Sequence, residues 1–112
     1  MYYVSKRLEI AASHRLNLPY PSPCTRLHGH NYVCTIHCRA QTLDDNGMVI
    51  DFKHIKEKVH DVLDHQCLND IFPFNPTAEN LARWICEQIP HCYKVSVWES
   101  ESNNATYETD AD

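Results

Sequence analysis

The chain has 112 residues, of which 43% are hydrophobic and 22% are charged, a composition typical of one globular domain. Its formal net charge is -5 and it contains no basic run, which argues against a surface that follows nucleic-acid phosphates. No segment resembles a signal peptide, and no apolar run approaches the roughly 20 residues that a membrane span requires. We therefore expect a cytoplasmic protein that forms one domain over residues 1–112, without nucleic-acid or membrane partners.

The N-terminal half predicts an antiparallel hairpin. Residues 2–12 alternate between apolar and polar side chains, as a half-buried strand does. Prolines interrupt residues 18–23, which we expect to form an ordered loop. A second alternating stretch covers residues 30–43, and the Asn-Gly pair within 44–47 is a strong turn signal. Residues 48–50 then suit a short third strand that pairs back on the second.

The C-terminal half predicts two helices followed by two strands. Asp51 is a suitable cap for the first helix, and Thr77 for the second. We place the helices over 52–63 and 77–89, the loop between them over 64–76, and the strands over 95–99 and 105–109. This order predicts an α+β fold with an antiparallel sheet.

Six cysteines would suit a disulfide framework in a short secreted chain. No Cys-x-x-Cys pair occurs, which argues against a zinc ribbon or a thioredoxin-like site. Most of the cysteines lie within apolar patterns, where a free thiol packs as a small hydrophobic group. We therefore interpret five of them as core or surface thiols, and Cys24 as the exception.

A metal site is predicted where two strands meet. His28 and His30 lie two residues apart on one strand, so both rings project from the same face. His14 follows the first strand and meets them if the two strands pair. Three neutral imidazoles suit Zn²⁺ and leave a fourth position open, as catalytic sites do. The spacing of His28 and His30 is also compatible with two polar side chains at a strand edge that bind no metal.

Four further histidines lie on polar faces or beside a turn, and the sequence assigns them no role. They are His37, His54, His60 and His91.

Two further segments carry groups suited to proton transfer. Cys24 precedes His28 by four residues, and a thiol near a zinc site could ligate the ion or serve as an acid or base. Proximity to a cation would raise its thiolate fraction; a loop cysteine that fills space is the alternative. Asp64 and His65 close the first helix, and a carboxylate can orient an imidazole. Adjacent side chains usually point apart, so capping or surface roles are equally compatible with this pair.

Two residues suit ligand binding. Glu99 ends an apolar strand with the parity of its buried residues, and a ligand with an amidine-like edge would satisfy an inward carboxylate. An exposed strand-end glutamate is the alternative. Thr77 begins the second helix, where free amides can bind a ligand, although an N-cap needs no further explanation.

Taken in order, these motifs resemble the 6-pyruvoyltetrahydropterin synthase / 6-carboxytetrahydropterin synthase family over essentially the whole chain. The matching segments are Ala12-Ser13-His14, Cys24-x3-His28-Gly29-His30-Asn31-Tyr32, Leu63-Asp64-His65, Leu68-Asn69, Asn75-Pro76-Thr77-Ala78-Glu79-Asn80 and Val97-Trp98-Glu99. The resemblance implies a tunnelling fold (T-fold), with an antiparallel sheet, two helices on one face, and subunits that assemble a β-barrel. It implies a homo-oligomer, a hexamer built as a dimer of trimers, with active sites between neighbours.

The resemblance also implies roles for single residues. Zinc would lie on His14, His28 and His30. Cys24, Asp64 and His65 would be the catalytic proton-transfer group, and Glu99 and Thr77 would bind the pterin substrate.

The short interval between Cys24 and His28 resembles the 6-carboxytetrahydropterin branch, used in making queuosine and related 7-deazaguanines. The implied lyase reaction converts 7,8-dihydroneopterin triphosphate to 6-carboxytetrahydropterin, acetaldehyde and triphosphate. The alternatives are the pyruvoyl branch, a catalytically silent module that binds pterin or zinc, and a protein that senses redox state through Cys24 without a metal.

Overall fold

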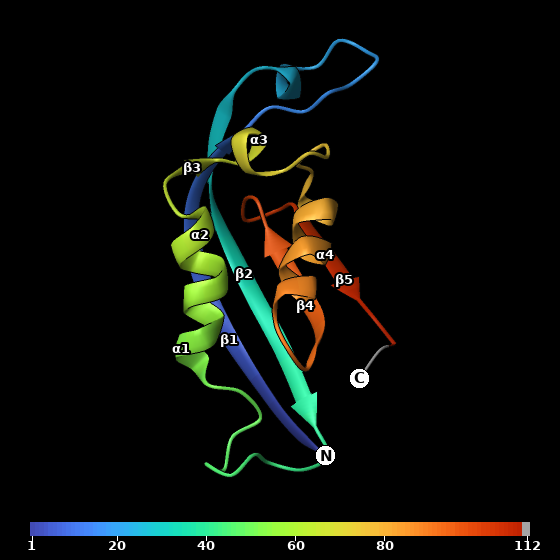
Figure 1. Ribbon diagram of the computed structural model, residues 1–112. Coiled ribbons are helices and arrows are strands. Elements are labelled where there is room, and N and C mark those ends of the chain that lie inside the picture. Colours follow the sequence, from blue (N-terminus) through green and yellow to red (C-terminus); the bar gives the residue numbers. More distant parts are fainter. Residues whose placement is uncertain (111–112) are drawn as a thin grey trace.

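Two long strands form the centre of the fold in the computed structural model, which describes residues 1–110. β1 (Tyr2–His14) and β2 (His28–Ala40) pair antiparallel over their full length (Figure 1). Alternate side chains of both strands are buried under the helices, as the pattern of apolar residues predicts. β2 begins and ends earlier than the predicted range of 30–43.

Within residues 1–110 the sheet is mixed, with the strand order β3-β1-β2-β4-β5. β4 (Cys92–Trp98) and β5 (Asn104–Glu108) extend its antiparallel part, as predicted. β3 (Gln66–Cys67) pairs parallel with the end of β1, so the prediction of a purely antiparallel sheet is wrong at this edge. A strand of this length shows no alternation that a sequence could reveal.

The predicted strand at residues 48–50 is wrong, because this segment lies in a loop. The predicted turn is present, and Gly47 has φ 81°. The Asp44 carboxylate accepts hydrogen bonds of 2.9 Å from the backbone N–H groups of Asn46 and Met48. These bonds wrap the backbone around one side chain, so the donors of the turn are satisfied without a third strand.

The first predicted helix is present but contains a π turn. It runs through α1 (Phe52–Ile55), the π turn η2 (Lys56–His60) and α2 (Asp61–Leu63). Asp51 is its N-cap, since the carboxylate accepts a 2.9 Å hydrogen bond from the N–H of Lys53. The π turn inserts a residue into the helical repeat and was not visible in the spacing of apolar residues.

Replacing Asp51 with alanine should lower the free energy of unfolding by about 1 kcal/mol, because the first helical turn loses its cap. Urea unfolding followed by circular dichroism measures this loss. Asp45→Ala changes an exposed carboxylate in the preceding turn and serves as the control. Equal stability of Asp51→Ala and Asp45→Ala would contradict the capping role.

The second predicted helix is α4 (Ala78–Gln88), and Thr77 caps it. The Thr77 hydroxyl accepts a 3.1 Å hydrogen bond from the N–H of Asn80. A further short helix, α3 (Leu68–Ile71), lies inside the segment predicted as a loop. Its single turn is too short for a helical pattern to be recognised.

The helices cover one face of the sheet, with the helix from α1 to α2 against β1 and with α4 over β4 and β5 (Figure 1). The core between the sheet and the helices consists mainly of aliphatic side chains and includes four buried cysteines. All six cysteines are free thiols. Among the described residues, none of the helices has the length and apolarity to cross a membrane.

Candidate metal centre

Three imidazoles meet where the hairpin β1–β2 opens into a loop. His14 and His28 are direct partners in the strand register, and His30 lies opposite Ala12 on the same face. The ring centroids are 4.6 Å apart for His14 and His28, 5.0 Å for His14 and His30, and 4.9 Å for His28 and His30. One potential ligand atom from each ring lies within 4.8 Å of the other two. The structure thus brings together the three residues predicted to bind zinc.

The hydrogen bonds of the rings favour metal binding through Nε2. His14 Nδ1 donates to the Pro76 carbonyl oxygen at 2.7 Å, and His28 Nδ1 donates to the Arg26 carbonyl oxygen at 2.7 Å. A donor proton on Nδ1 leaves the lone pair of a neutral ring on Nε2. The Nε2 atoms of His14 and His30 are buried and have no hydrogen-bond partner among the described residues. This donor set fits Zn²⁺, which would satisfy those atoms.

Burial keeps His14 in the form that a metal requires. Its side chain is 1% exposed, and burial lowers its pKa. The hydrogen bond to Pro76 opposes this effect, while the neighbouring His28 adds to it. A metal ligand must be neutral imidazole, so the lowered pKa favours binding.

Tyr32 contacts His14 in the interior of the chain. The sequence had assigned Tyr32 no role of its own. It is fully buried, and its hydroxyl lies 3.1 Å from His14 Nδ1. Burial raises the pKa of Tyr32, and the nearby Glu99 carboxylate adds to the shift. The hydroxyl therefore stays protonated. Its shared parity with His28 and His30 is the sequence signal that could have identified it.

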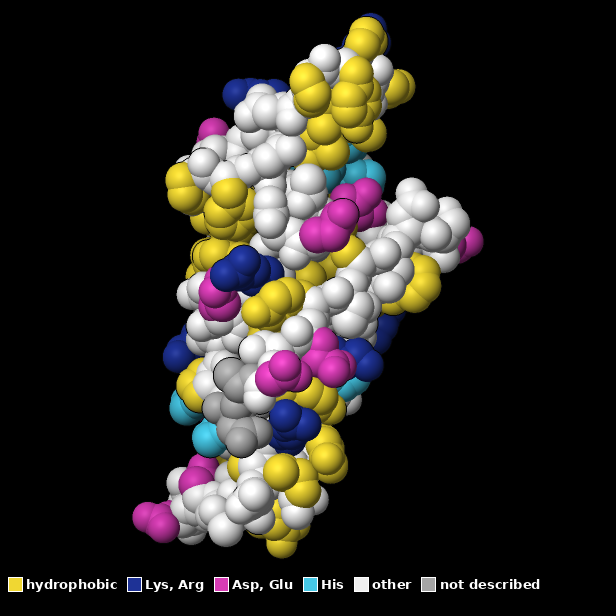
Figure 2. Space-filling model, turned by 90° about the vertical axis from the view of Figure 1, so that its right-hand side faces the viewer, with side chains coloured by type: hydrophobic (Ala, Val, Ile, Leu, Met, Phe, Trp, Pro, Cys, Tyr) yellow, Lys and Arg dark blue, Asp and Glu magenta, His cyan; other side chains and the backbone are white. Residues whose placement is uncertain are grey.

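Glu99 lies beside the histidines, just beyond the end of β4. Its Oε2 is 4.0 Å from His30 Nε2, and its side chain is 22% exposed. Both residues line an open hollow of about 780 Å³. Figure 2 shows histidine side chains next to acidic ones, directly below a hydrophobic tip of the molecule. A half-buried carboxylate at this place can accept hydrogen bonds from a ligand bound near the histidines.

Asp64 and His65 contact each other, against the expectation that adjacent side chains point apart. His65 has φ 61°, a left-handed conformation that turns its ring back toward Asp64. Its Nε2 lies 3.3 Å from Asp64 Oδ2. Asp64 Oδ1 accepts a 2.9 Å hydrogen bond from the N–H of Ala11, and the His65 N–H donates to the Ala11 carbonyl at 2.6 Å. The edge of β1 therefore holds Asp64 and His65 in place.

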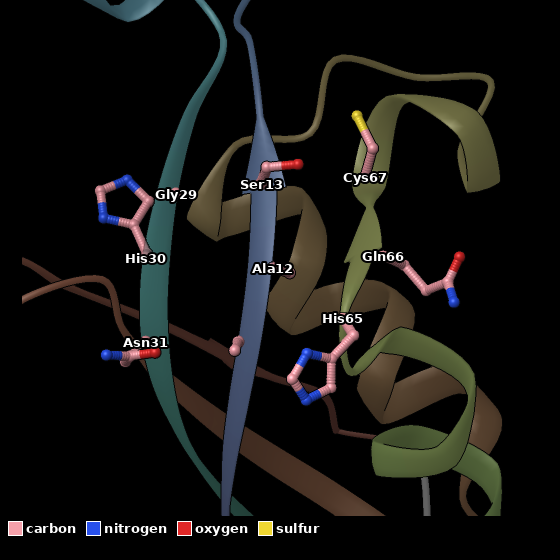
Figure 3. A pocket seen from close by; sticks show the side chains of 9 residues that line it. Ala12, Ser13, Gly29, His30, Asn31, His65, Gln66 and Cys67 are labelled. Atoms are coloured by element: carbon pink, nitrogen blue, oxygen red, sulfur yellow. The ribbon is translucent and has the colours of Figure 1, made fainter.

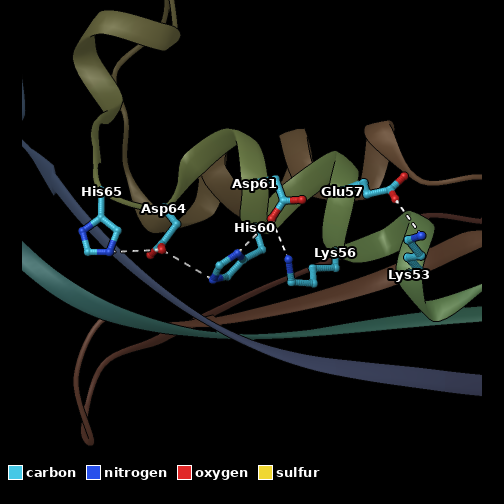
Figure 4. A network of polar contacts seen from close by, with 7 residues as sticks. All are labelled: Lys53, Lys56, Glu57, His60, Asp61, Asp64 and His65. Carbon is cyan, nitrogen blue, oxygen red and sulfur yellow. Dashed lines mark hydrogen bonds and ion pairs between the residues drawn. The ribbon is translucent and has the colours of Figure 1, made fainter.

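A second histidine reaches Asp64 from the helix, although the sequence assigned it no role. His60 Nε2 lies 3.6 Å from Asp64 Oδ2, and His60 Nδ1 lies 3.3 Å from Asp61 Oδ1. Lys56 continues the chain of contacts with a 2.8 Å bond to Asp61 (Figure 4). The spacing of four residues between His60 and Asp64 is the sequence signal for this contact.

One residue of the Asp64–His65 pair and one of the three clustered histidines line the same hollow. A hollow of about 420 Å³ is lined by His30 on one side and His65 on the other. Figure 3 shows the His30 ring projecting from β2 and the His65 ring lying beyond β1. His65 is also highly exposed, with 81% of its side chain accessible. Within residues 1–110 of one chain, these groups do not converge on a single enclosed pocket.

Cys24 lies in the short 3-10 helix η1 (Pro23–Thr25), in the loop that joins β1 and β2 (Figure 1). Ser22 caps this turn, with its hydroxyl 3.2 Å from the N–H of Cys24. The Cys24 carbonyl accepts a 2.8 Å hydrogen bond from the N–H of Leu16. Cys24 is half-buried, at the same end of the hairpin as the histidines.

Two asparagines attach that loop to the rest of the chain. The Asn69 amide exchanges hydrogen bonds of 2.8 and 2.9 Å with the backbone of Arg15. The Asn75 amide does the same with Asn17, at 2.9 and 3.2 Å. Asn75 thereby holds the segment that carries Pro76, whose carbonyl orients His14.

Comparisons with known proteins agree with this geometry. The model of a family described as 6-pyruvoyl tetrahydropterin synthase matches residues 3–110. The chain is 29% identical to the 6-carboxy-5,6,7,8-tetrahydropterin synthase of Bacillus subtilis, over 95% of this chain and 84% of that protein. It is 30% identical to the 6-pyruvoyl tetrahydrobiopterin synthase of Dictyostelium discoideum, over 93% of each chain. The solved structure of Caenorhabditis elegans 6-pyruvoyl tetrahydropterin synthase is similar, with a TM-score of 0.77, 27% identity, and coverage of 97% of this chain and 96% of that one.

Proposed function

The chain belongs to the 6-pyruvoyl tetrahydropterin synthase family, and from this membership we propose that it is a zinc-dependent 6-carboxy-5,6,7,8-tetrahydropterin synthase. Its substrate would be 7,8-dihydroneopterin triphosphate. With one water consumed, the three side-chain carbons would be divided between the carboxyl group of 6-carboxytetrahydropterin and acetaldehyde, and triphosphate would leave. This lyase reaction would serve the synthesis of queuosine and related 7-deazaguanines.

The observation that carries the proposal is the cluster of three imidazoles, two of which have a buried Nε2 atom without a hydrogen-bond partner among the described residues. His14, His28 and His30 would hold the ion, with a further position left for substrate. When bound there, zinc would supply Lewis-acid polarisation of the hydroxyl and carbonyl oxygens of the substrate side chain. The hydrogen bonds from His14 to Pro76 and from His28 to Arg26 would keep both rings in the required orientation.

The protein's own groups would bind the pterin and move its protons. Glu99 would accept two hydrogen bonds from the amidine-like edge of the pterin, and the N-terminus of α4 at Thr77 would contribute a further contact. His65 would take and return protons, with Asp64 stabilising its charged form. Cys24 would serve as the proton-transfer group on the other face of the ring.

The active site would be completed by a neighbouring subunit. The outer strand β5 leaves the sheet open at that edge, and the described chain has too few strands to close a barrel. His65 is exposed and lies across the strands from the metal centre. A hexamer built as a dimer of trimers would bring the acid–base pair of one subunit to the histidines of another.

Product analysis tests this function directly. The purified chain is incubated with zinc and 7,8-dihydroneopterin triphosphate, the pterin product is identified by mass spectrometry, and acetaldehyde is assayed separately. We expect 6-carboxytetrahydropterin together with acetaldehyde. A 6-pyruvoyl product without acetaldehyde would assign the chain to the other branch, which the similarity to the Dictyostelium discoideum protein keeps as the second candidate. Pterin binding without turnover would instead indicate a silent binding module.

Replacing Glu99 with glutamine should raise the KM for the pterin substrate by roughly 10- to 100-fold, because a charge-assisted pair of hydrogen bonds is lost. The zinc content should stay unchanged, since Glu99 is not among the three histidine ligands. Steady-state kinetics and metal analysis measure both quantities. Glu101→Gln, which changes an exposed carboxylate lining the same hollow, is the matched control. A KM shift shared by both variants would contradict the anchoring role.

A further inference from the structure

Three buried thiols meet far from the metal centre, between the sheet and α4. Cys38 is fully buried, while Cys86 and Cys92 are 5% and 7% exposed. Cys38 lies on β2, Cys92 begins β4, and Cys86 lies on the buried face of α4, which covers β4 in Figure 1. The proposed function uses none of them.

A bulge between β2 and β4 brings Cys92 into this cluster. The inward residues of β4 are Val95 and Val97, so strict alternation would turn Cys92 outward. The register between β2 and β4 shifts beside Cys38, and this bulge returns Cys92 to the core as the direct partner of Cys38. Bulges of this kind re-aim a single side chain without ending the strand.

The turn before β4 completes the arrangement. His91 has φ 66°, a left-handed conformation that reverses the chain after α4. The Ile89 N–H donates to the Cys86 carbonyl at 3.4 Å, and the Cys92 N–H donates to the Ile89 carbonyl at 3.2 Å. These bonds hold the end of α4 against the start of β4, so that Cys86 and Cys92 face each other.

The thiols differ in chemistry according to their contacts. The interaction of the Cys92 thiol with Cys38 lowers the pKa of Cys38 and raises the pKa of Cys92. The Cys92 S–H donates to the Lys94 carbonyl oxygen at 3.6 Å. Burial raises the pKa of Cys86 to about 12. A lower pKa means a larger thiolate fraction, and the thiolate is the nucleophile. Burial opposes the lowering of the Cys38 pKa, and the contact with Cys92 outweighs it.

We propose that Cys38 and Cys92 form a peroxide-oxidisable thiol pair that closes to an intramolecular disulfide between β2 and β4. Direct partners in an antiparallel register have Cα atoms about 4.5–5.5 Å apart. Disulfides span about 4.4–6.8 Å between Cα atoms, a range that includes the spacing of direct register partners. Burial restricts the oxidant to a small one, which a peroxide is.

The chemistry balances with one hydrogen peroxide. The Cys38 thiolate attacks one peroxide oxygen, the O–O bond breaks, and hydroxide leaves and takes up a proton to form water. Cys38 is then a sulfenic acid. The Cys92 sulfur attacks the Cys38 sulfur, the S–O bond breaks, and the proton of Cys92 leaves with the hydroxyl group as a second water. Two thiols are oxidised to one disulfide and the peroxide is reduced to two waters.

Peptide mapping of the oxidised full chain tests the proposal. The purified protein is treated with hydrogen peroxide, the peroxide is removed with catalase, and free thiols are alkylated under denaturing conditions. We expect a linked pair of peptides containing Cys38 and Cys92, which dithiothreitol separates. Full alkylation of both cysteines, or a disulfide joining Cys86 to Cys92, would overturn the proposal. This result does not depend on zinc or turnover, so it is independent of the proposed function.

Two variants make the assignment specific. In Cys92→Ser the linked peptides should be lost, and dimedone should trap Cys38 as its sulfenic acid after peroxide treatment. In Cys67→Ser, which changes a half-buried cysteine outside the cluster, the linkage should form as in the wild type. Loss of the linkage in Cys67→Ser, or no dimedone adduct at Cys38 in Cys92→Ser, would contradict the proposal. Because the linked peptides are sought in the wild-type chain, the test does not depend on the folding of a variant.

Discussion

Replacing His28 with alanine is expected to remove zinc from the protein and to reduce lyase turnover to background. Structural zinc sites in zinc-finger peptides bind the ion with roughly 10–16 kcal/mol. The loss of one of three imidazoles should therefore cost about 4 kcal/mol, a decrease in zinc affinity of about 10³-fold. Titration against a chelator of known affinity measures the zinc affinity, and the assay with 7,8-dihydroneopterin triphosphate measures turnover.

The structure offers a matched control on the same strand. His37 lies on β2, on the opposite face from His28, where its ring faces Tyr93. His37→Ala should keep both zinc affinity and turnover. Full activity of His28→Ala, or equal zinc affinity in the two variants, would contradict the assignment of the metal centre to His14, His28 and His30.

Replacing His65 with asparagine should lower turnover by roughly 10²- to 10⁴-fold, the usual contribution of a positioned acid or base. Asparagine is chosen because it tolerates the left-handed backbone conformation that His65 adopts, so the fold is preserved. Its amide group cannot act as a general acid or base near neutral pH. The zinc content should be unchanged, since the ring lies across the strands from the metal ligands.

His54→Asn provides the comparison for this variant. His54 is an exposed histidine on α1, outside the contacts of Asp64. Steady-state turnover and zinc content are measured for both variants under the same conditions. If His65→Asn turned over as fast as His54→Asn, His65 would not act in proton transfer and the role of the Asp64–His65 pair would be structural.

The sequence predicted the parts of the fold that rest on long repeating patterns. The alternation of β1 and β2, and the capping residues Asp51 and Thr77, marked elements that the structure confirms. The exceptions were set by tertiary contacts. β3 is too short to show a pattern, and its pairing depends on where the chain returns to β1. The π turn and the bulge beside Cys38 each insert one residue into a regular repeat, which composition does not reveal.

In the candidate site, too, some contacts could be predicted from strand patterns and others depended on tertiary structure. Strand parity predicted that His28 and His30 share a face, and pairing of the strands brought His14 beside them. The contact between Asp64 and His65 was not predictable, because it depends on a left-handed residue that is not glycine. Pro76 was missed as the partner of His14 because the two are 62 positions apart and the contact uses a backbone carbonyl.

X-ray absorption at the zinc edge of the purified, zinc-loaded protein is the most direct measurement of the metal centre. We predict one zinc per chain, with imidazole nitrogens from His14, His28 and His30 at about 2.0–2.1 Å and an additional oxygen ligand at a similar distance. The His28→Ala variant should lose this signal. Sulfur scattering at about 2.3 Å would place the metal on cysteine instead, and it would contradict the proposed centre.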